Sequence, residues 1–114
     1  MSSIFTKIIR GEIPAKVVKR QDDMIAFHDV NPQAPVHVLV VPVQEVAAVR
    51  DCAGPEGQAL LGRLMQFAAQ VATELGLDAD GYRLVTNTGR YGGQSVFHLH
   101  VHIMGGRPMG WPPG

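Results

Sequence analysis

The stretch that decides the fold is Phe97-His98-Leu99-His100-Val101-His102-Ile103-Met104, in which histidines alternate with apolar residues. Successive side chains of an extended strand point to opposite faces, so this alternation predicts a strand over residues 97–104. The apolar side chains are expected to face a core, and His98, His100 and His102 to line the other side. Because the ordinary pKa of imidazole lies near neutrality, such a row favours proton transfer, nucleophilic attack or metal ligation over a purely structural role.

The rest of the pattern predicts one long helix, one short helix and more strands. The long helix is entered through residues 54–56 and closed by Gly76, and its apolar residues recur three and four apart on one face. These residues are Leu60, Leu61, Leu64, Met65, Ala68, Val71, Ala72 and Leu75. A short helix is predicted over residues 4–10, and strands over residues 15–19, 24–30, 36–41 and 82–88. We therefore expect an α+β fold, in which an antiparallel sheet of about five strands carries the long helix on its apolar face and leaves the histidine face open.

Composition limits what the chain can bind. Residues 1–114 are expected to form a single domain with one core. The ten basic and ten acidic residues balance without long runs of either sign, which argues against a broad surface for nucleic acid or membrane. No stretch approaches the roughly 20 apolar residues that cross a bilayer, and residues 1–7 lack an apolar signal core. The single cysteine, Cys52, excludes an internal disulfide and a cysteine-based zinc module, as expected of a cytoplasmic protein.

A glycine-rich loop precedes the histidine stretch. Gly89, Gly92 and Gly93 permit backbone conformations that turn N–H groups toward an anion, and Gln94 and Ser95 add side-chain hydrogen-bonding groups. Most such loops merely connect strands, and this one matches neither the dinucleotide fingerprint nor the P-loop. Beside a row of imidazoles, however, it favours a phosphate group as the ligand.

Metal ligation is the main alternative for the histidines. Two histidines that alternate on a strand lie about 7 Å apart at Cα, a spacing that zinc sites use, but the third would lie about 13 Å from the first. His37, on the predicted strand over residues 36–41, would be a further candidate ligand beside His98 and His100. Because three-fold ligation from one strand is strained, we expect chemistry without a metal or other cofactor.

Taken together, these motifs resemble the histidine triad superfamily, in which three histidines alternate with apolar residues and two more apolar residues follow. The wider match is to the Hint branch of that superfamily and runs through nearly the whole chain. The segments that carry it are Ile4-Phe5, Lys7-Ile8-Ile9, Glu12-Ile13-Pro14-Ala15-Lys16, Ala26-Phe27-His28-Asp29, Pro32-Gln33-Ala34-Pro35, Gly92-Gly93-Gln94-Ser95 and Trp111-Pro112-Pro113-Gly114.

The resemblance implies an activity. Members of this branch are homodimeric hydrolases of the P–N bond in purine nucleoside phosphoramidates. Their middle triad histidine, here His100, attacks the α-phosphorus and forms a nucleotidyl-histidine intermediate that water releases. The main-chain carbonyl of His98 would hold the His100 ring, while His102 and His37 would support phosphate contacts and proton movement. Ser95 would lie near the departing amine.

The resemblance also implies a nucleotide site. Asp29 would hold the ribose hydroxyls, and an apolar slot would hold the purine. For Phe27, Ile8 and Ile13, an ordinary place in the core is an equally good interpretation. The residues expected to contact the nucleotide, besides Asp29, are Ile4, Phe5, Ile8, Ile13, Phe27, His28, Val30, Asn87, Gly93, Gln94 and Val96.

The C-terminal tail fits the family pattern, and one position after the third predicted strand departs from it. In relatives the tail lies at the dimer interface, so Trp111 is expected to reach the partner's site. The histidine-bearing strands or the long helices of two protomers would meet across a two-fold axis and continue the sheet. Many relatives have a histidine shortly after the proline that ends the third strand, where this chain has Glu45, which leaves rate or substrate range open.

The hydrolysis implied by the resemblance would include aminoacyl adenylates as further substrates. Three other functions remain as alternatives. A dinucleoside polyphosphate hydrolase of the Fhit branch is disfavoured by residues 93–95 and by the Trp-Pro-Pro tail. A non-enzymatic adaptor that binds purine nucleotides is the second alternative. A role in repairing adenylated DNA would need a basic surface or zinc module that this sequence lacks.

Overall fold

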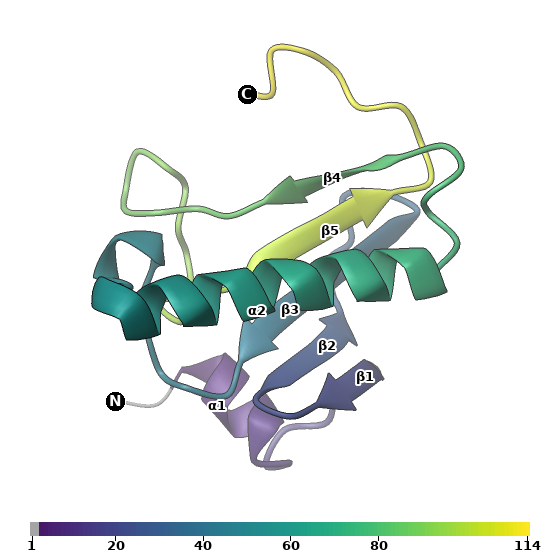
Figure 1. Cartoon of the computed structure of the whole chain (residues 1–114). Helices are drawn as coiled ribbons and strands as arrows, with labels where there is room; N and C mark the ends of the chain where they lie inside the picture. The colour runs from purple at the N-terminus through teal and green to yellow at the C-terminus, as the bar shows by residue number, and fades with distance from the viewer. Residues whose placement is uncertain (1–2) are drawn as a thin grey trace.

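The computed structural model describes residues 3–114 as one sheet with a helix on each face (Figure 1). The expectation that residues 1–7 carry no signal core includes residues 1 and 2, which lie outside the residues that the structure describes. The sheet has the strand order β1-β2-β3-β5-β4, and all neighbouring strands are antiparallel. This confirms the predicted α+β fold. The elements are α1 (Ile4–Ile9), β1 (Val17–Gln21), β2 (Met24–His28), β3 (Val36–Pro42), the 3-10 helix η1 (Val49–Asp51), α2 (Gly54–Glu74), β4 (Tyr82–Val85) and β5 (Val101–Gly105).

The long helix α2 runs across one face of the sheet (Figure 1). Leu64 and Val71 are fully buried in one cluster with Val40 and Ile103 from the strands. The predicted apolar stripe is confirmed except at Met65, which is 45% exposed. Phe67 is buried instead, because it lies three residues beyond Leu64 on the inner face.

Helix α2 begins at Gly54, with Pro55 in its first turn, and two further glycines lie near its ends. Gly57 lies so close to the preceding loop that a Cβ atom would come within 2.5 Å of the Cys52 carbonyl carbon. Gly76 follows the helix with a φ of +76°, a left-handed conformation that glycine adopts without steric cost. The start and end of the long helix therefore agree with the sequence signals.

The other face of the sheet is not open, which corrects our expectation. Helix α1 covers part of it, and Phe5 and Ile9 are buried in a second cluster with Phe27, Leu39 and Val41. The physical reason is that β2 and β3 are apolar on both faces. All five residues of β2 except His28 are buried, so this part of the sheet needs a cover on each side.

Several predicted strands end elsewhere. Strand β1 starts two residues later and runs to Gln21, before a turn in which Asp22 has a φ of 54°. Strand β2 stops at His28 rather than Val30, because the Asp29 carboxylate accepts the main-chain N–H of Asn31 and turns the chain. Strand β3 extends to Pro42, and β4 stops at Val85 rather than residue 88.

The largest correction concerns the histidine stretch, because only residues 101–105 form β5. The polar groups of the preceding segment bond outside a strand ladder. The Leu99 N–H donates to the Val46 carbonyl over 2.6 Å, and the Thr86 hydroxyl donates to the His100 carbonyl over 2.9 Å. Phe97, expected in the core, is 66% exposed. Alternation therefore predicted the buried side of Leu99, Val101 and Ile103 correctly, but the predicted strand begins four residues before β5 does.

Candidate active site

His100 ends the irregular segment just before β5. Its Nδ1 atom lies 2.7 Å from the main-chain oxygen of His98, and a carbonyl oxygen only accepts, so Nδ1 carries the proton. The other nitrogen, Nε2, is left with a lone pair. Burial is the main cause that lowers the pKa of His100 below the ordinary imidazole value, against the raising effect of the His98 hydrogen bond. At neutral pH the side chain is therefore a neutral imidazole with a nucleophilic nitrogen.

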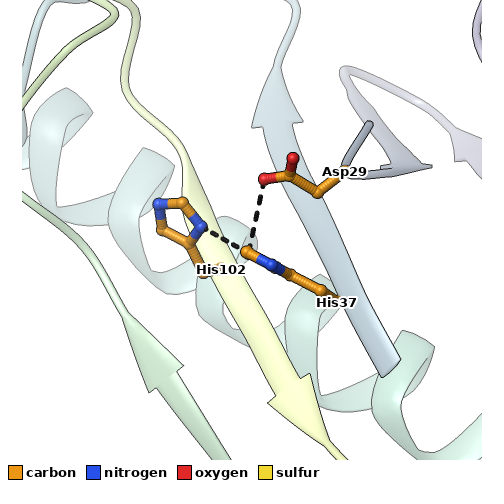
Figure 2. Close-up of side chains that lie close together, drawn as sticks. All are labelled: Asp29, His37 and His102. Carbon is orange, nitrogen blue, oxygen red and sulfur yellow. Dashed lines mark hydrogen bonds and ion pairs between the residues drawn. The ribbon is translucent and has the colours of Figure 1, made fainter. Parts of the chain in front are cut away.

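His102, His37 and Asp29 form a polar cluster where β2, β3 and β5 lie side by side (Figure 2). His37 Nε2 lies 2.8 Å from His102 Nδ1 and 3.4 Å from Asp29 Oδ2. Burial, followed by the neighbouring His100 and His37, lowers the pKa of His102 to about 4. His102 is consequently neutral at pH 7.

The ring of His98 has a different environment from the other two triad rings. It is 2% exposed, and its Nε2 donates to the Pro42 carbonyl over 2.8 Å. Its Nδ1 faces the hydroxyls of Ser3 at 3.3 Å and Thr6 at 3.4 Å. The His98 ring therefore joins α1 to the end of β3, while its main chain holds His100, which is the contact that the family resemblance implies.

Ser3, Thr6 and Glu45 support this arrangement, and sequence reasoning missed the first two. Ser3 caps α1 by accepting the Thr6 N–H over 3.2 Å. The Thr6 hydroxyl donates to Glu45 over 2.6 Å, and this bond lowers the pKa of the Glu45 carboxyl. A serine three residues before a hydroxyl residue at the start of an apolar run was the available signal for the cap.

A cavity of about 310 Å³ opens beside His100 and His102. Phe5 lies between the apolar wall of this cavity and His100, and its ring centroid lies 4.9 Å from that of His100 and 5.6 Å from that of Phe27. Phe27 belongs both to the core and to the cavity wall, so the two interpretations of this residue are not exclusive. The lining residues are Ile4, Phe5, Ile8, Ile13, Pro14, Ala15, Phe27, His28, Asp29, Val30, Leu39, Ser95, Val96, His100 and His102, of which sequence reasoning missed Pro14, Ala15 and Leu39.

Three predicted nucleotide contacts lie outside that lining. The Asn87 amide donates to the Gly92 carbonyl over 2.6 Å, inside the loop itself. The Gln94 side chain accepts the Gly89 N–H over 2.9 Å and donates to Ala47 over 2.7 Å, so it fixes the loop to the segment after β3. Gly93 has a φ of +78° and serves the turn. The direct contacts of these residues with a nucleotide stay a prediction.

A second cleft, of about 740 Å³, adjoins the first along residues 28–30. It contains His37 and Lys16 but neither His100 nor His102. We take the smaller cavity as the candidate active site, because it holds the nitrogen that can attack. Asp29 lies on the boundary and lines both spaces.

The C-terminal tail lies away from the cavity of its own chain. Trp111 is 84% exposed and does not line that cavity, and Arg83 holds the tail through the Gly110 carbonyl at 2.6 Å.

The structure changes the set of residues that could bind a metal ion. Among residues 3–114, the ligand atoms that gather within 4.8 Å are those of Asp29, His37 and His102, not those of His98 and His100. Within the same residues, no helix has the length and apolar composition needed to cross a membrane.

Known proteins share this sequence and fold. A family model, the HIT domain, matches residues 10–109. The purine nucleoside phosphoramidase of Escherichia coli K12 is 48% identical over 108 residues, covering 95% of this chain and 90% of that protein. An uncharacterised HIT-like protein of Synechocystis is 55% identical over 112 residues, covering 98% and 96%. A HIT family hydrolase from Legionella pneumophila superimposes with a TM-score of 0.94 at 43% identity, covering 99% of this chain and 100% of that one. As the histidine pattern predicted, the chain belongs to the HIT domain family.

Proposed function

We propose that this protein hydrolyses the P–N bond of purine nucleoside 5′-phosphoramidates, with adenosine or guanosine as the nucleoside and aminoacyl adenylates as further substrates. The observation that carries the proposal is the 2.7 Å contact between His100 Nδ1 and the His98 carbonyl, which leaves the Nε2 lone pair at an apolar cavity. The 48% identity to a phosphoramidase supports the choice of substrate.

The reaction would proceed in two steps. In the first, Nε2 of His100 bonds to the α-phosphorus while the P–N bond breaks and the departing nitrogen takes up a proton. The resulting imidazolium keeps its Nδ1 proton, and the His98 carbonyl stabilises the charge. In the second step water attacks phosphorus and loses a proton, and the bond to His100 breaks. Ser95 and His102, which both line the cavity, are the proposed groups for moving the first proton.

The nucleoside would occupy the apolar end of the cavity. Phe5 and Phe27 offer aromatic surface for a purine, and Asp29 offers a carboxylate for the ribose hydroxyls. One carboxylate oxygen already accepts the Asn31 N–H at 2.8 Å, which fixes the direction of the other. We infer that Asp29 is oriented for the ribose before the substrate arrives.

We also propose a homodimer, with one change to the expected geometry. Strand β5 pairs with β3 on one side and β4 on the other, so the histidine-bearing strands have no free edge to offer a partner. A sheet continued across a two-fold axis must use an edge strand, and β4 is the edge next to β5. Trp111, exposed in the single chain, would then reach the partner's cavity.

Intact mass spectrometry after rapid mixing with adenosine phosphoramidate tests the function. We expect the protein to gain the mass of an adenylyl group within one turnover, and His100→Ala not to gain it. Nucleotide binding without adduct or turnover would instead support the adaptor. Faster cleavage of diadenosine triphosphate than of adenosine phosphoramidate would support the dinucleoside polyphosphate hydrolase.

A further inference from the structure

The protonation pattern of His37 is fixed from outside the cavity. The main-chain N–H of Gln33 donates to His37 Nδ1 over 3.0 Å. A ring nitrogen that accepts a hydrogen bond carries no proton, so neutral His37 must carry its proton on Nε2. That atom faces His102 Nδ1 at 2.8 Å and Asp29 Oδ2 at 3.4 Å, both of which can accept (Figure 2). All contacts of the His37 ring therefore agree with one tautomer.

This tautomer determines what His102 can offer a substrate. Because Nδ1 of neutral His102 accepts from His37, its own proton lies on Nε2. His102 then presents an N–H donor from its second nitrogen, whereas His100 presents a lone pair. If His37 carried its proton on Nδ1, that proton would oppose the Gln33 N–H, and His102 would have to donate through Nδ1. A main-chain N–H thus selects between a donating and an accepting His102.

The loop that carries Gln33 is held by the first residues after β5. Arg107 Nη2 donates to the Gln33 carbonyl over 3.0 Å. Next to it, Gly106 has a φ of +88° and packs so closely on the loop that a Cβ atom would lie 2.8 Å from the Cβ of Pro35. Neither Gln33 nor Arg107 lines the cavity. The main-chain N–H of Gln33 links this loop directly to His37, while the Gln33 side chain makes a separate link to Asp29, because it donates to the carbonyl of Asn31 over 3.1 Å and the Asn31 N–H bonds the Asp29 carboxylate.

We propose that Gln33 sets the tautomers of His37 and His102, and that Arg107 is the positioning residue that holds Gln33 in place. The catalytic meaning of these tautomers rests on the proposed function, but the tautomers themselves are a property of the free protein. The same arrangement opposes a cation bound by Asp29, His37 and His102. A histidine that binds a metal presents a bare nitrogen to it and donates through the other, which is the reverse of His37.

Long-range ¹H–¹⁵N correlation spectra of the imidazoles in the full-length protein at pH 7 test the first part. The expected result is a proton on Nε2 of His37 and of His102, and on Nδ1 of His100. A His37 proton on Nδ1 would overturn the proposal. Gln33→Pro, which removes the N–H, should shift His37 toward the other tautomer, whereas Gln33→Ala, which keeps it, should not. Because the wild-type spectrum already decides the question, the test survives if the proline variant fails to fold.

Arg107→Met tests the positioning residue against a matched control. We expect the His37 resonances to become a mixture of tautomers in Arg107→Met, with the wild-type pattern restored in Arg107→Lys. Arg83→Met removes the other arginine that bonds the tail and should leave the tautomers unchanged. An unchanged His37 pattern in Arg107→Met would show that Asp29 and His102 suffice, and would remove Arg107 from the proposal.

Kinetics separate this proposal from the proposed function. With adenosine phosphoramidate, Arg107→Met should lower kcat roughly threefold to tenfold, the range for one lost hydrogen bond, and leave KM near the wild-type value. A parallel rise in KM with unchanged kcat would contradict a role through His37. If the protein turns over no phosphoramidate at all, the proposed function fails, while the spectra still decide the tautomers.

Discussion

On one face of the sheet, the 21 residues of α2 cover apolar strands with apolar side chains, whereas on the other face the six residues of α1 share the cover with polar contacts. Leu64 and Val71 belong to the buried apolar cluster between α2 and the sheet, but Phe5 packs against His100, and Ser3 and Thr6 bond His98. The α2 face thus supplies stability. On the α1 face, polar contacts interrupt the apolar packing, and the imidazoles lie beside a cavity.

His100→Ala should abolish the chemistry of the site on the α1 face while leaving the fold intact. Turnover of adenosine phosphoramidate should disappear, since the attacking nitrogen is gone, while AMP should still bind within about tenfold of the wild type, or about 1.4 kcal/mol. Steady-state kinetics and calorimetric titration with AMP measure the two halves. Turnover near the wild-type rate would contradict the covalent mechanism.

Leu64→Ala should break the α2 face with the opposite outcome. Leu64 is fully buried, so its truncation leaves a cavity and should lower the free energy of unfolding by about 2–5 kcal/mol. Gln70→Ala, on the exposed side of the same helix, should change it by no more than about 0.5 kcal/mol. Denaturant titration measures both variants, and kcat of the folded fraction should stay near the wild-type value. Equal losses in the two variants would mean that α2 does not carry the core.

Sequence reasoning worked best on the α2 face. A helix of 3.6 residues per turn repeats its apolar positions at a fixed spacing, so the pattern from Leu60 to Leu75 identified the inner side of α2 from local information. Met65 was misplaced, and Phe67, which lies two residues farther and about 200° around the helix, was overlooked.

The α1 face could not be predicted in the same way. His98 meets Pro42 and Ser3 across 56 and 95 residues of chain, and no local period reports such contacts. The alternation of residues 97–104 is present in the sequence, but hydrogen bonds to the Val46 carbonyl and from the Thr86 hydroxyl replace the ladder that a strand needs. Asp29, His37 and His102 come together because β2, β3 and β5 are neighbours, which only the strand order reveals.

Lowering the pH should reduce the stability of the protein through the histidines on the face of the sheet that α1 covers. The pKa of His102 is about 4 in the folded protein and near 6.5 when unfolded, so between these values the unfolded chain binds more protons. The stability that neutral His102 contributes is therefore fully present above pH 6.5 and is lost as the pH falls toward 4. His100, whose pKa is also lowered, acts in the same direction.

Urea titrations from pH 7 to pH 4 measure this loss. We expect His102→Gln to show a shallower decline than the wild type, because it lacks the titrating group that faces His100, His37 and Asp29. Identical slopes in the two proteins would mean that acid acts elsewhere, for example on the exposed carboxylates. The Leu64→Ala variant should be displaced to lower stability at every pH without a change of slope.

The tail gives the smallest expected effect, since it belongs to neither face of its own chain. Arg83 holds the Gly110 carbonyl at 2.6 Å, and Trp111 remains 84% exposed, a large apolar group in water unless a partner covers it.

Truncation after Pro108 removes Trp111 but keeps Arg107 and its bond to Gln33. We expect this variant to stay dimeric, because an edge-strand interface does not need the tail. Its preference among leaving amines should change by about twofold to tenfold, the range for one lost aromatic contact. Light scattering after size exclusion and a panel of phosphoramidates with different amines measure the two effects. A monomeric wild type would refute the shared site, and an unchanged amine profile would assign Trp111 no part in it.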